Sequence, residues 1–230
     1  MLEGHSILGV RSTHVLLRRS VRPASELREI TGLKDDQALA VVFFAADLHL
    51  EEVWGRRLEI ATALTTAGYA FAVAPSFSIY EPRSRFEQLY NLFRSMRFFE
   101  LLQAHHVPAI PRIGWIILHD IRRAAQWLNE NQEVRVVALD VMTVKAPRAW
   151  DLHLQGVKYF DSLTGHRLHY VINGPGTHSR RRTMAAVVPL ERLTYTRATL
   201  AAPVSAVERT TEDPYGWQAR VRIDEALDAA

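Results

Sequence analysis

The stretch LAVVFFAADLHLEEVWGRRLEIATALTTAGYAFAVAP, residues 39–75, decides the fold. Its apolar runs, 39–45 and 69–75, have the length and composition of buried strands. The amphipathic run between them, 51–68, predicts a helix that ends at Gly68. A strand, a helix and a second strand in this order form a βαβ unit with parallel strands. The pattern therefore indicates an α/β protein.

The same alternation continues along the chain, with one unit about every thirty residues, the spacing of βαβ crossovers. We expect further strands at 107–115, which contains two prolines, and at 134–141, 166–172, 192–200 and in the N-terminal ILGVRS, 7–12. We expect further helices at 83–106, 118–132, 147–165 and 177–188. Five or six units predict a TIM-like (β/α) barrel, incomplete or irregular. An open doubly wound parallel sheet is the alternative, and the chain lacks the G-x-G-x-x-G fingerprint that often accompanies it.

The composition fits one large globular domain that stays out of the membrane. The chain has 230 residues, of which 48% are hydrophobic. No window reaches the roughly 18 apolar residues of a membrane-spanning helix. The start lacks the basic and apolar regions of a signal peptide. Because the chain has no cysteine, disulfides and thiolate sites are excluded, and we expect a cytoplasmic location.

The charge is uneven along the chain rather than large. The net charge is +3, and only three of the 28 basic residues are lysine. We expect a basic segment over 1–38 that packs on the barrel, the barrel itself over 39–200, and an acidic tail over 201–230. A basic head permits contacts with phosphate groups without requiring them.

Polar side chains stand where the predicted strands end. In parallel α/β folds the carboxyl ends of the strands carry the ligand site. The residues at these ends are Asp47, Ser78, Tyr80, Arg112, Trp115, Asp140 and Asn173. Asp47 and Asp140 are candidates for acid/base catalysis, and the other residues are candidates for ligand binding. Each residue also has a purely structural explanation, as a helix cap or a turn residue.

The turn NGPGTHSRRR, 173–182, is the best single candidate for anion binding. Its glycines let the backbone approach a ligand, and the helix that follows presents free N–H groups. We therefore add Gly174, Gly176 and His178 to the predicted ligand-binding residues. The turn is not a Walker A loop, and a plain Pro-Gly turn is the alternative interpretation.

The predicted helix 83–106 carries an apolar stripe that we expect to face the core, made of Phe86, Leu89, Tyr90, Phe93, Met96, Phe99 and Leu102. Asn91, Arg94 and Arg97 interrupt this stripe at a spacing of three. Asn91 and Arg94 are predicted to bind a ligand, because arginine pairs well with carboxylates and phosphates. Pairing with an acid such as Glu87 or Glu100 is the alternative.

Several site classes are missing from the sequence. The histidines form no H-E-x-x-H or similar metal signature, and no G-x-S-x-G elbow accompanies the serines. We therefore predict no metal site, although a metal held by Asp47 and Asp140 stays open. No cofactor and no oligomeric state are indicated.

The ordered motifs from Leu39 to Leu200 resemble the family called domain of unknown function 4417, found in bacteria, phages and plasmids. The matching features are an Asp followed by a V-W pair, a P-D-F-S-x-Y segment, a helix with N-x-[YF]-R and a later Gln, an I-P-x-x-x-W strand, and a late glycine turn. In this chain they are Asp47 with Val53-Trp54, PSFSIY (75–80), Asn91 to Arg94 with Gln103, IPRIGW (110–115) and NGPG (173–176).

The chain departs from the family pattern at two places. Ser76 stands where the family has an Asp, and the second Arg expected soon after Arg94 falls on Met96, with Arg97 one place later. The first departure removes an acid that a catalytic or metal site could use.

The resemblance and the strand-end residues together lead to one functional expectation. We expect a mobile-element protein of phage or plasmid type that binds, and could act on, a phosphate-bearing ligand such as a nucleotide or a nucleic-acid end. The alternative is a DNA-binding or replication-accessory protein without catalytic activity.

Overall fold

The computed structural model describes residues 7–18, 20–31, 33, 38–80, 82–174 and 177–196. Its strands form two four-stranded parallel sheets. The first sheet contains β1 (Ile7–Arg11), β2 (Ala38–Val42), β3 (Phe71–Val73) and β4 (Ala109–Ile110), and the second contains β5 (Arg112–Ile113), β6 (Val136–Asp140), β7 (His169–Asn173) and β8 (Leu193–Thr196). The prediction of a parallel α/β fold is confirmed.

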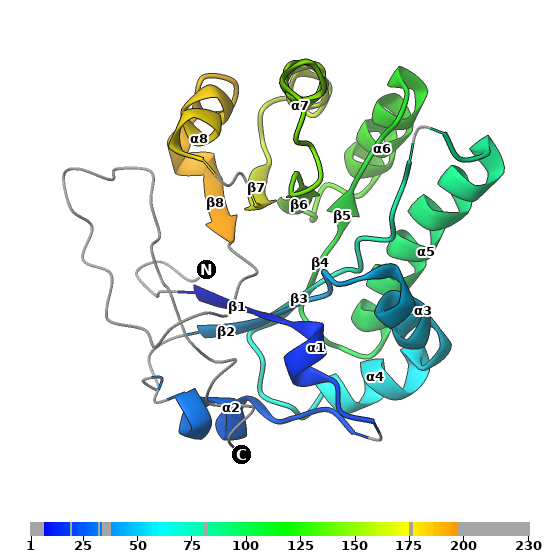
Figure 1. The fold of residues 1–230 in the computed structure, drawn as a ribbon, viewed down its shortest axis with the longest axis vertical. Coiled ribbons are helices and arrows are strands. Elements are labelled where there is room, and N and C mark those ends of the chain that lie inside the picture. The colour runs from blue at the N-terminus through cyan, green and yellow to red at the C-terminus, as the bar shows by residue number, and fades with distance from the viewer. Residues whose placement is uncertain are drawn as a thin grey trace.

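Helices alternate with the strands, as Figure 1 shows. They are α1 (Ser12–Val15), α2 (Ala24–Thr31), α3 (Asp47–Gly55), α4 (Arg57–Leu64), α5 (Arg85–Ala104), α6 (Leu118–Glu130), α7 (Pro147–Leu163) and α8 (His178–Ala185), with a short 3-10 turn at Leu190–Arg192. The single helix expected over 51–68 is two helices, because the backbone breaks at Arg56 with φ −100° and ψ 13°. The helices α1 and α2 were not predicted.

The strands follow one another in chain order within each sheet, without the reversal that a doubly wound sheet has. The two sheets meet at Pro111, which separates β4 from β5. Residues 109–110 pair with β3, and residues 112–113 pair with β6. Among the described residues, no pairing joins β8 back to β1, so the sheets do not close.

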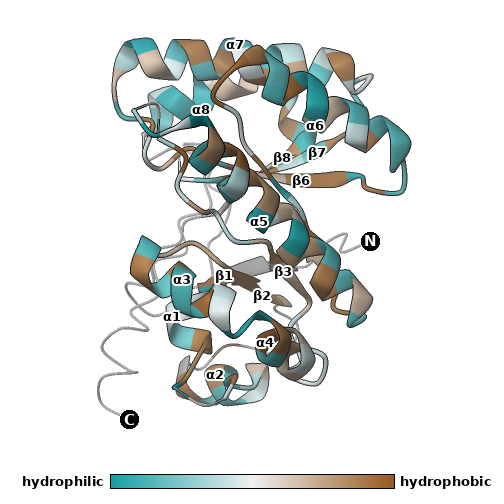
Figure 2. Ribbon diagram, turned by 90° about the vertical axis from the view of Figure 1, so that its right-hand side faces the viewer, coloured by the Kyte–Doolittle hydropathy of each residue, from teal (hydrophilic) through white to brown (hydrophobic). Residues whose placement is uncertain are grey.

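Three apolar clusters hold the layers together. Two of them lie between the sheets and the helices, one for each sheet. The third joins the two sheets to each other and contains Val42, Val73, Ile110, Ala138 and Val171. Figure 2 shows apolar strands, such as β6, between helices that carry hydrophilic residues outward. The inner faces of both sheets therefore share one core.

The N-terminal segment supplies part of the sheet, because β1 pairs with β2 over five residues. The expected tail, 201–230, lies outside the described residues. No helix of the described part is long and apolar enough to cross a membrane.

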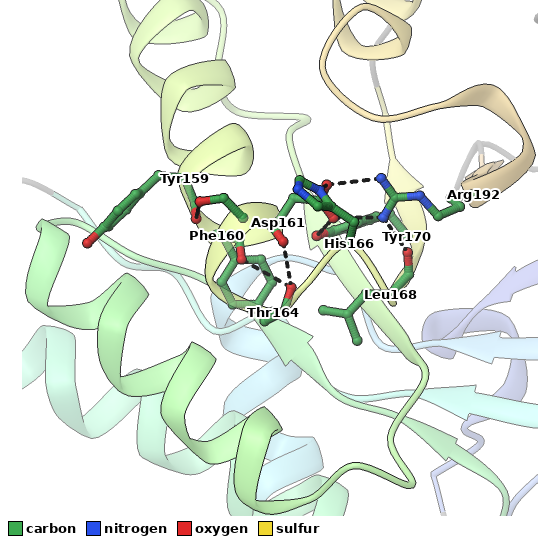
Figure 3. Close-up of polar contacts among 9 residues, drawn as sticks. Tyr159, Phe160, Asp161, Thr164, His166, Leu168, Tyr170 and Arg192 are labelled. Carbon is green, nitrogen blue, oxygen red and sulfur yellow. Dashed lines mark hydrogen bonds and ion pairs between the residues drawn. The ribbon is translucent and has the colours of Figure 1, made fainter.

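A buried carboxylate ties the last units together (Figure 3). Asp161, at the end of α7, accepts hydrogen bonds from both terminal nitrogens of Arg192, at 2.7 and 2.9 Å, and from the hydroxyl of Tyr170 on β7, at 2.9 Å. His166 Nδ1 lies 2.6 Å from the same carboxylate. Burial alone would raise the pKa of Asp161, but the hydrogen bonds from Arg192, His166 and Tyr170 outweigh burial and lower it.

We predict that Asp161→Asn destabilises the protein by about 3 kcal/mol at pH 7, because it leaves the Arg192 cation without its carboxylate. Urea unfolding at pH 7 measures this. Because the pKa of Asp161 is lowered in the folded state, its contribution is present above the unfolded pKa and disappears as the pH falls through the folded pKa. The control is Asp151→Asn, an exposed carboxylate on the same helix, and an equal effect of both changes would contradict the prediction.

Candidate functional site

A pocket of about 470 Å³ lies at the carboxyl ends of β2, β3, β5 and β6. Six residues predicted for the site line it, namely Asp47, Ser78, Tyr80, Arg112, Trp115 and Asp140. Ser76, Thr143 and His153 add further polar groups, and side chains such as Ile79, Ile113 and Val144 form apolar walls. Six of the strand-end residues predicted for the site therefore share one cavity, whereas Asn173 does not line it.

The sheet register explains why three of the polar residues share one face. Alternate residues of a strand point to the same side. Ile110, Ala138 and Val171 lie in the inner core, so Arg112, Asp140 and Asn173, each two residues further along, continue that inner face. Arg112 is in register with Ala138, and Asp140 with Asn173. The inner face thus changes from apolar to polar at the carboxyl ends.

Arg112 is the most unusual of these residues. It is 9% exposed, and its Nε and Nη1 atoms have no hydrogen-bond partner among the described residues. Burial lowers the pKa of its guanidinium, and the nearby charge of Asp140 opposes that shift. The side chain folds back against Gly114, where a Cβ atom would lie 2.2 Å from Nη1. A side chain at position 114 would therefore force the guanidinium to move.

Asp140 is the carboxylate that faces Arg112. Burial raises its pKa, while the charge of Arg112 and hydrogen bonds from Ser76, the Met142 N–H and Asn173 act in the opposite direction. The Ser76 hydroxyl donates to Oδ2 at 2.8 Å, and the Met142 N–H donates to Oδ1 at 3.1 Å. Asp140 therefore holds a proton at a higher pH than an exposed aspartate.

The segment 76–78 forms hydrogen bonds with both candidate acid/base residues, Asp47 and Asp140. Ser76 donates to Asp140, and two residues later Ser78 donates to Asp47 Oδ1 at 2.6 Å. Phe77 between them is buried, and its ring packs edge-on against Trp54 at 6.0 Å. The apolar anchor fixes the segment, so its two hydroxyls orient Asp140 and Asp47.

Asn91 and Arg94 lie beside this pocket rather than in it. They line a second cavity of about 310 Å³, which shares Asp47, Ser78 and Tyr80 with the first. Arg94 donates to both carboxylate oxygens of Glu51, at 2.8 and 2.6 Å, and to Asn91 Oδ1 at 2.6 Å. Asn91 in turn donates to the Ser78 carbonyl at 2.6 Å. Both residues thus support the segment 76–78.

The core stripe predicted for 83–106 is wrong at three positions. Phe86, Tyr90 and Phe93 are 79%, 42% and 53% exposed. The buried face of α5 instead contains Gln88, Arg94, Ser95, Phe98, Phe99 and Leu102. Arg94 can be buried because Glu51 and Asn91 pair with it and because its guanidinium lies 4.0 Å from the centre of the Phe77 ring. The expected alternative of an acid partner applies to both arginines, since Arg94 pairs with Glu51 and Arg97 pairs with Glu100.

The glycine turn has a structural role at its described positions. Gly174 has φ +81°, and a Cβ there would lie 2.0 Å from Met142 Cγ. The glycine therefore lets the backbone lie close to the Met142 side chain, whereas the sequence argument expected it to lie close to a ligand. His178 is exposed at the start of α8 and does not line the pocket. Gly176 lies outside the described residues. Asn173 is buried and bonded to Asp140, and its Oδ1 lacks a partner in the described part of the chain.

His153 is a pocket residue that the sequence argument did not select, and Ser76, a polar residue at a strand end, was not among the predicted ligand-binding residues. His153 lines the pocket from α7, and its ring stacks on Trp115 with centroids 4.9 Å apart. The available signal was the repeated DLHL, 47–50 and 151–154, which places a histidine near the start of two helices that follow strands.

The part of the chain that the structure describes shows no cluster of side chains suited to hold a metal ion. Within the ranges that the structure describes, no group of three or more His, Cys, Asp or Glu residues converges as metal ligands would.

Comparisons with known proteins add a family and weak structural similarities. Residues 9–168 match the family described as Domain of unknown function (DUF4417). No curated protein matches the chain significantly. The carboxyl transferase domain of Rhizobium etli pyruvate carboxylase, solved with 3-bromopyruvate, is 12% identical with a TM-score of 0.41, and the match covers 99% of this chain and 44% of that one. The putative copper homeostasis protein CutC from Streptococcus agalactiae is 12% identical with a TM-score of 0.35, over 84% of this chain and 100% of that one. Both TM-scores are too low to support an argument about this chain.

The Ser76–Asp140 contact gives a testable prediction. Ser76→Asp, which introduces the acid of the family pattern, places two carboxyl groups in hydrogen-bond contact, where both cannot be ionised cheaply. The folded pKa of the pair then lies above its unfolded value. The contribution of this pair to stability is therefore fully present below the unfolded pKa and is lost as the pH rises through the folded pKa, by ~1.4 kcal/mol for each unit of the shift.

Thermal unfolding between pH 5 and pH 8 tests this, with Ser76→Asn as the uncharged control of the same size. We expect the melting temperature of Ser76→Asp to fall relative to the control as the pH rises. Parallel curves for the two variants would show that the carboxylates do not interact.

Proposed function

The chain belongs to the family Domain of unknown function (DUF4417), whose name assigns no activity, and we propose that it binds a phosphate-bearing ligand in the strand-end pocket. The occurrence of the resembling family in phages and plasmids makes a nucleotide or a nucleic-acid end the first ligand class to test. In this proposal Arg112 holds the phosphate, and Asp140 and Asp47 are the acid/base candidates.

The observation that carries the proposal is the unpaired guanidinium of Arg112. A buried charge without full pairing is expensive, and natural proteins keep such groups mainly where function needs them. Two of its N–H-bearing nitrogens have no partner among the described residues, and the residue lines the pocket. The fork of N–H donors on a guanidinium matches the oxygens of a phosphate. A bound phosphate would supply acceptors for these two nitrogens.

Asp140 complements this role. A phosphate beside two ionised aspartates would be repelled, so the charge state of Asp140 matters for binding. Because burial raises its pKa, Asp140 accepts a proton more readily than an ordinary aspartate. In its protonated form it donates a hydrogen bond to a phosphate oxygen or a proton to a leaving group. Asp47, which accepts a hydrogen bond from Ser78 and lines the same pocket, is the candidate for the complementary base.

The architecture supports the same location. We propose that the two sheets form a TIM-like barrel that is open between β8 and β1. The chain-order pairing and the inner core shared by both sheets support this interpretation. In such barrels the site lies at the carboxyl ends of the strands, where this pocket is.

The alternative, a DNA-binding protein that acts through its arginines, receives less support from the described surface. Arg83, which precedes α5, pairs with Glu87, and Arg97 pairs with Glu100 within α5, so part of the positive charge is already neutralised. The experiment below still distinguishes the two functions.

We predict that Arg112→Met weakens the binding of adenosine monophosphate by ~10- to 100-fold, the effect of losing charged hydrogen bonds. Its melting temperature should equal or exceed that of the natural chain, because an incompletely paired buried charge is removed. Isothermal titration calorimetry and thermal unfolding measure the two effects. Gly114→Ala is a second variant that keeps the charge but displaces the guanidinium, and it should also weaken binding.

The control is Arg135→Met, which removes the same charge next to the opposite end of β6. We expect it to bind like the natural chain. Equal binding by all variants would overturn the proposal. Steep salt dependence of oligonucleotide binding, unaffected by Arg112→Met, would favour the DNA-binding alternative.

A further inference from the structure

The imidazole of His153 is held rigidly at the wall of the pocket. Its ring is nearly parallel to Trp115, at 13° with centroids 4.9 Å apart, and lies at 24° to Trp150 with centroids 6.3 Å apart. Trp150 is fixed in turn, since its Nε1 donates to Thr183 Oγ1 at 2.9 Å. The two indoles therefore restrict the imidazole to one orientation.

A glycine on the same helix makes this arrangement possible. At Gly156, one turn after His153 on α7, a Cβ atom would lie 2.7 Å from Trp115 Nε1. Any larger residue would push the indole away from the helix. Trp115 can therefore lie beside His153 because residue 156 is a glycine and leaves space for the indole.

His153 has hydrogen-bonding capacity that no other described residue uses. Its Nε2 atom is buried and has no partner within the described residues. Burial, and then the charge of Arg112, lower the pKa of His153 to about 4. The ring is therefore neutral at physiological pH, and it offers a hydrogen bond rather than a second positive charge.

Arg112 and His153 line the same pocket. The guanidinium satisfies an anion, whereas a neutral imidazole nitrogen pairs with a hydroxyl or an N–H group. The cavity of about 470 Å³ leaves room for more than a phosphate group alone. A buried group built to bind a hydroxyl also rejects ligands that lack one, because its own nitrogen would stay unpaired.

We propose that His153 is a specificity-determining residue whose Nε2 binds a hydroxyl group near the phosphate of the ligand. The pocket then prefers a phosphate ester that carries hydroxyls, such as a sugar phosphate or a nucleotide, over inorganic phosphate and over a simple alkyl phosphate. This inference rests on the proposed function of Arg112 as the phosphate anchor.

Calorimetric titration with three probes tests the inference, namely inorganic phosphate, ethyl phosphate and ribose 5-phosphate. The two esters have the same charged group and differ in their hydroxyls. We expect the natural chain to bind ribose 5-phosphate at least ~10-fold more tightly than ethyl phosphate, the effect of about one hydrogen bond to a buried group. In His153→Phe, which keeps the stacked ring, this preference should disappear while the affinity for ethyl phosphate stays unchanged.

A second variant, His153→Gln, restores a polar group and should recover part of the preference. A residue that only packs against Trp115 and Trp150 would change the melting temperature but not the ratio of the two affinities. Equal affinities of the natural chain for the two esters, or an unchanged ratio in His153→Phe, would overturn the inference. If the proposed phosphate binding by Arg112 fails instead, Arg112→Met would leave the binding of all three probes unaltered. That result is distinct from an unchanged affinity ratio in His153→Phe.

Discussion

The pairing of one extended segment, residues 109–113, with β3 on one side and β6 on the other is the constraint on which the structure depends. Pro111 interrupts this segment, so it belongs to both sheets and joins them. The joint brings Ile110 into the inner core and places Arg112 two residues further, level with Ala138. The apolar core and the pocket are therefore separated by only two residues along this segment.

Several buried polar atoms without a hydrogen-bond partner among the described residues lie at or next to the strand-end pocket, although the Nε atoms of Arg11, Arg22 and Arg94 also lack one. Within the described residues, Arg112, His153 and Asn173 all have buried polar atoms without partners, and all three adjoin Asp140 or its pocket. By contrast, the buried Asp161 is bonded to Arg192, His166 and Tyr170. The contrast between a saturated structural carboxylate and an unsaturated pocket is the physical basis for assigning function to the pocket.

The sequence was sufficient to predict the parallel α/β fold and which strand ends carry polar residues, because apolar runs and their lengths are local properties. It could not predict that Arg94 is buried while Phe86, Tyr90 and Phe93 are exposed, since the partner of Arg94, Glu51, lies 43 residues away. Likewise, Ser76 and His153 acquire their roles from contacts with Asp140 and Trp115 on other units. Long-range contacts decide side-chain roles that periodicity leaves open.

We propose that the N–H donors of Arg112 that have no partner among the described residues bind an anion in the pocket. Nuclear magnetic resonance of arginine Nε–H groups tests it most directly, with adenosine monophosphate added to the labelled protein. We expect the Arg112 Nε–H signal to shift in a saturable manner, while that of Arg192, which already has a carboxylate partner, stays in place. An Arg112 signal that does not respond, while surface arginines do, would contradict the account.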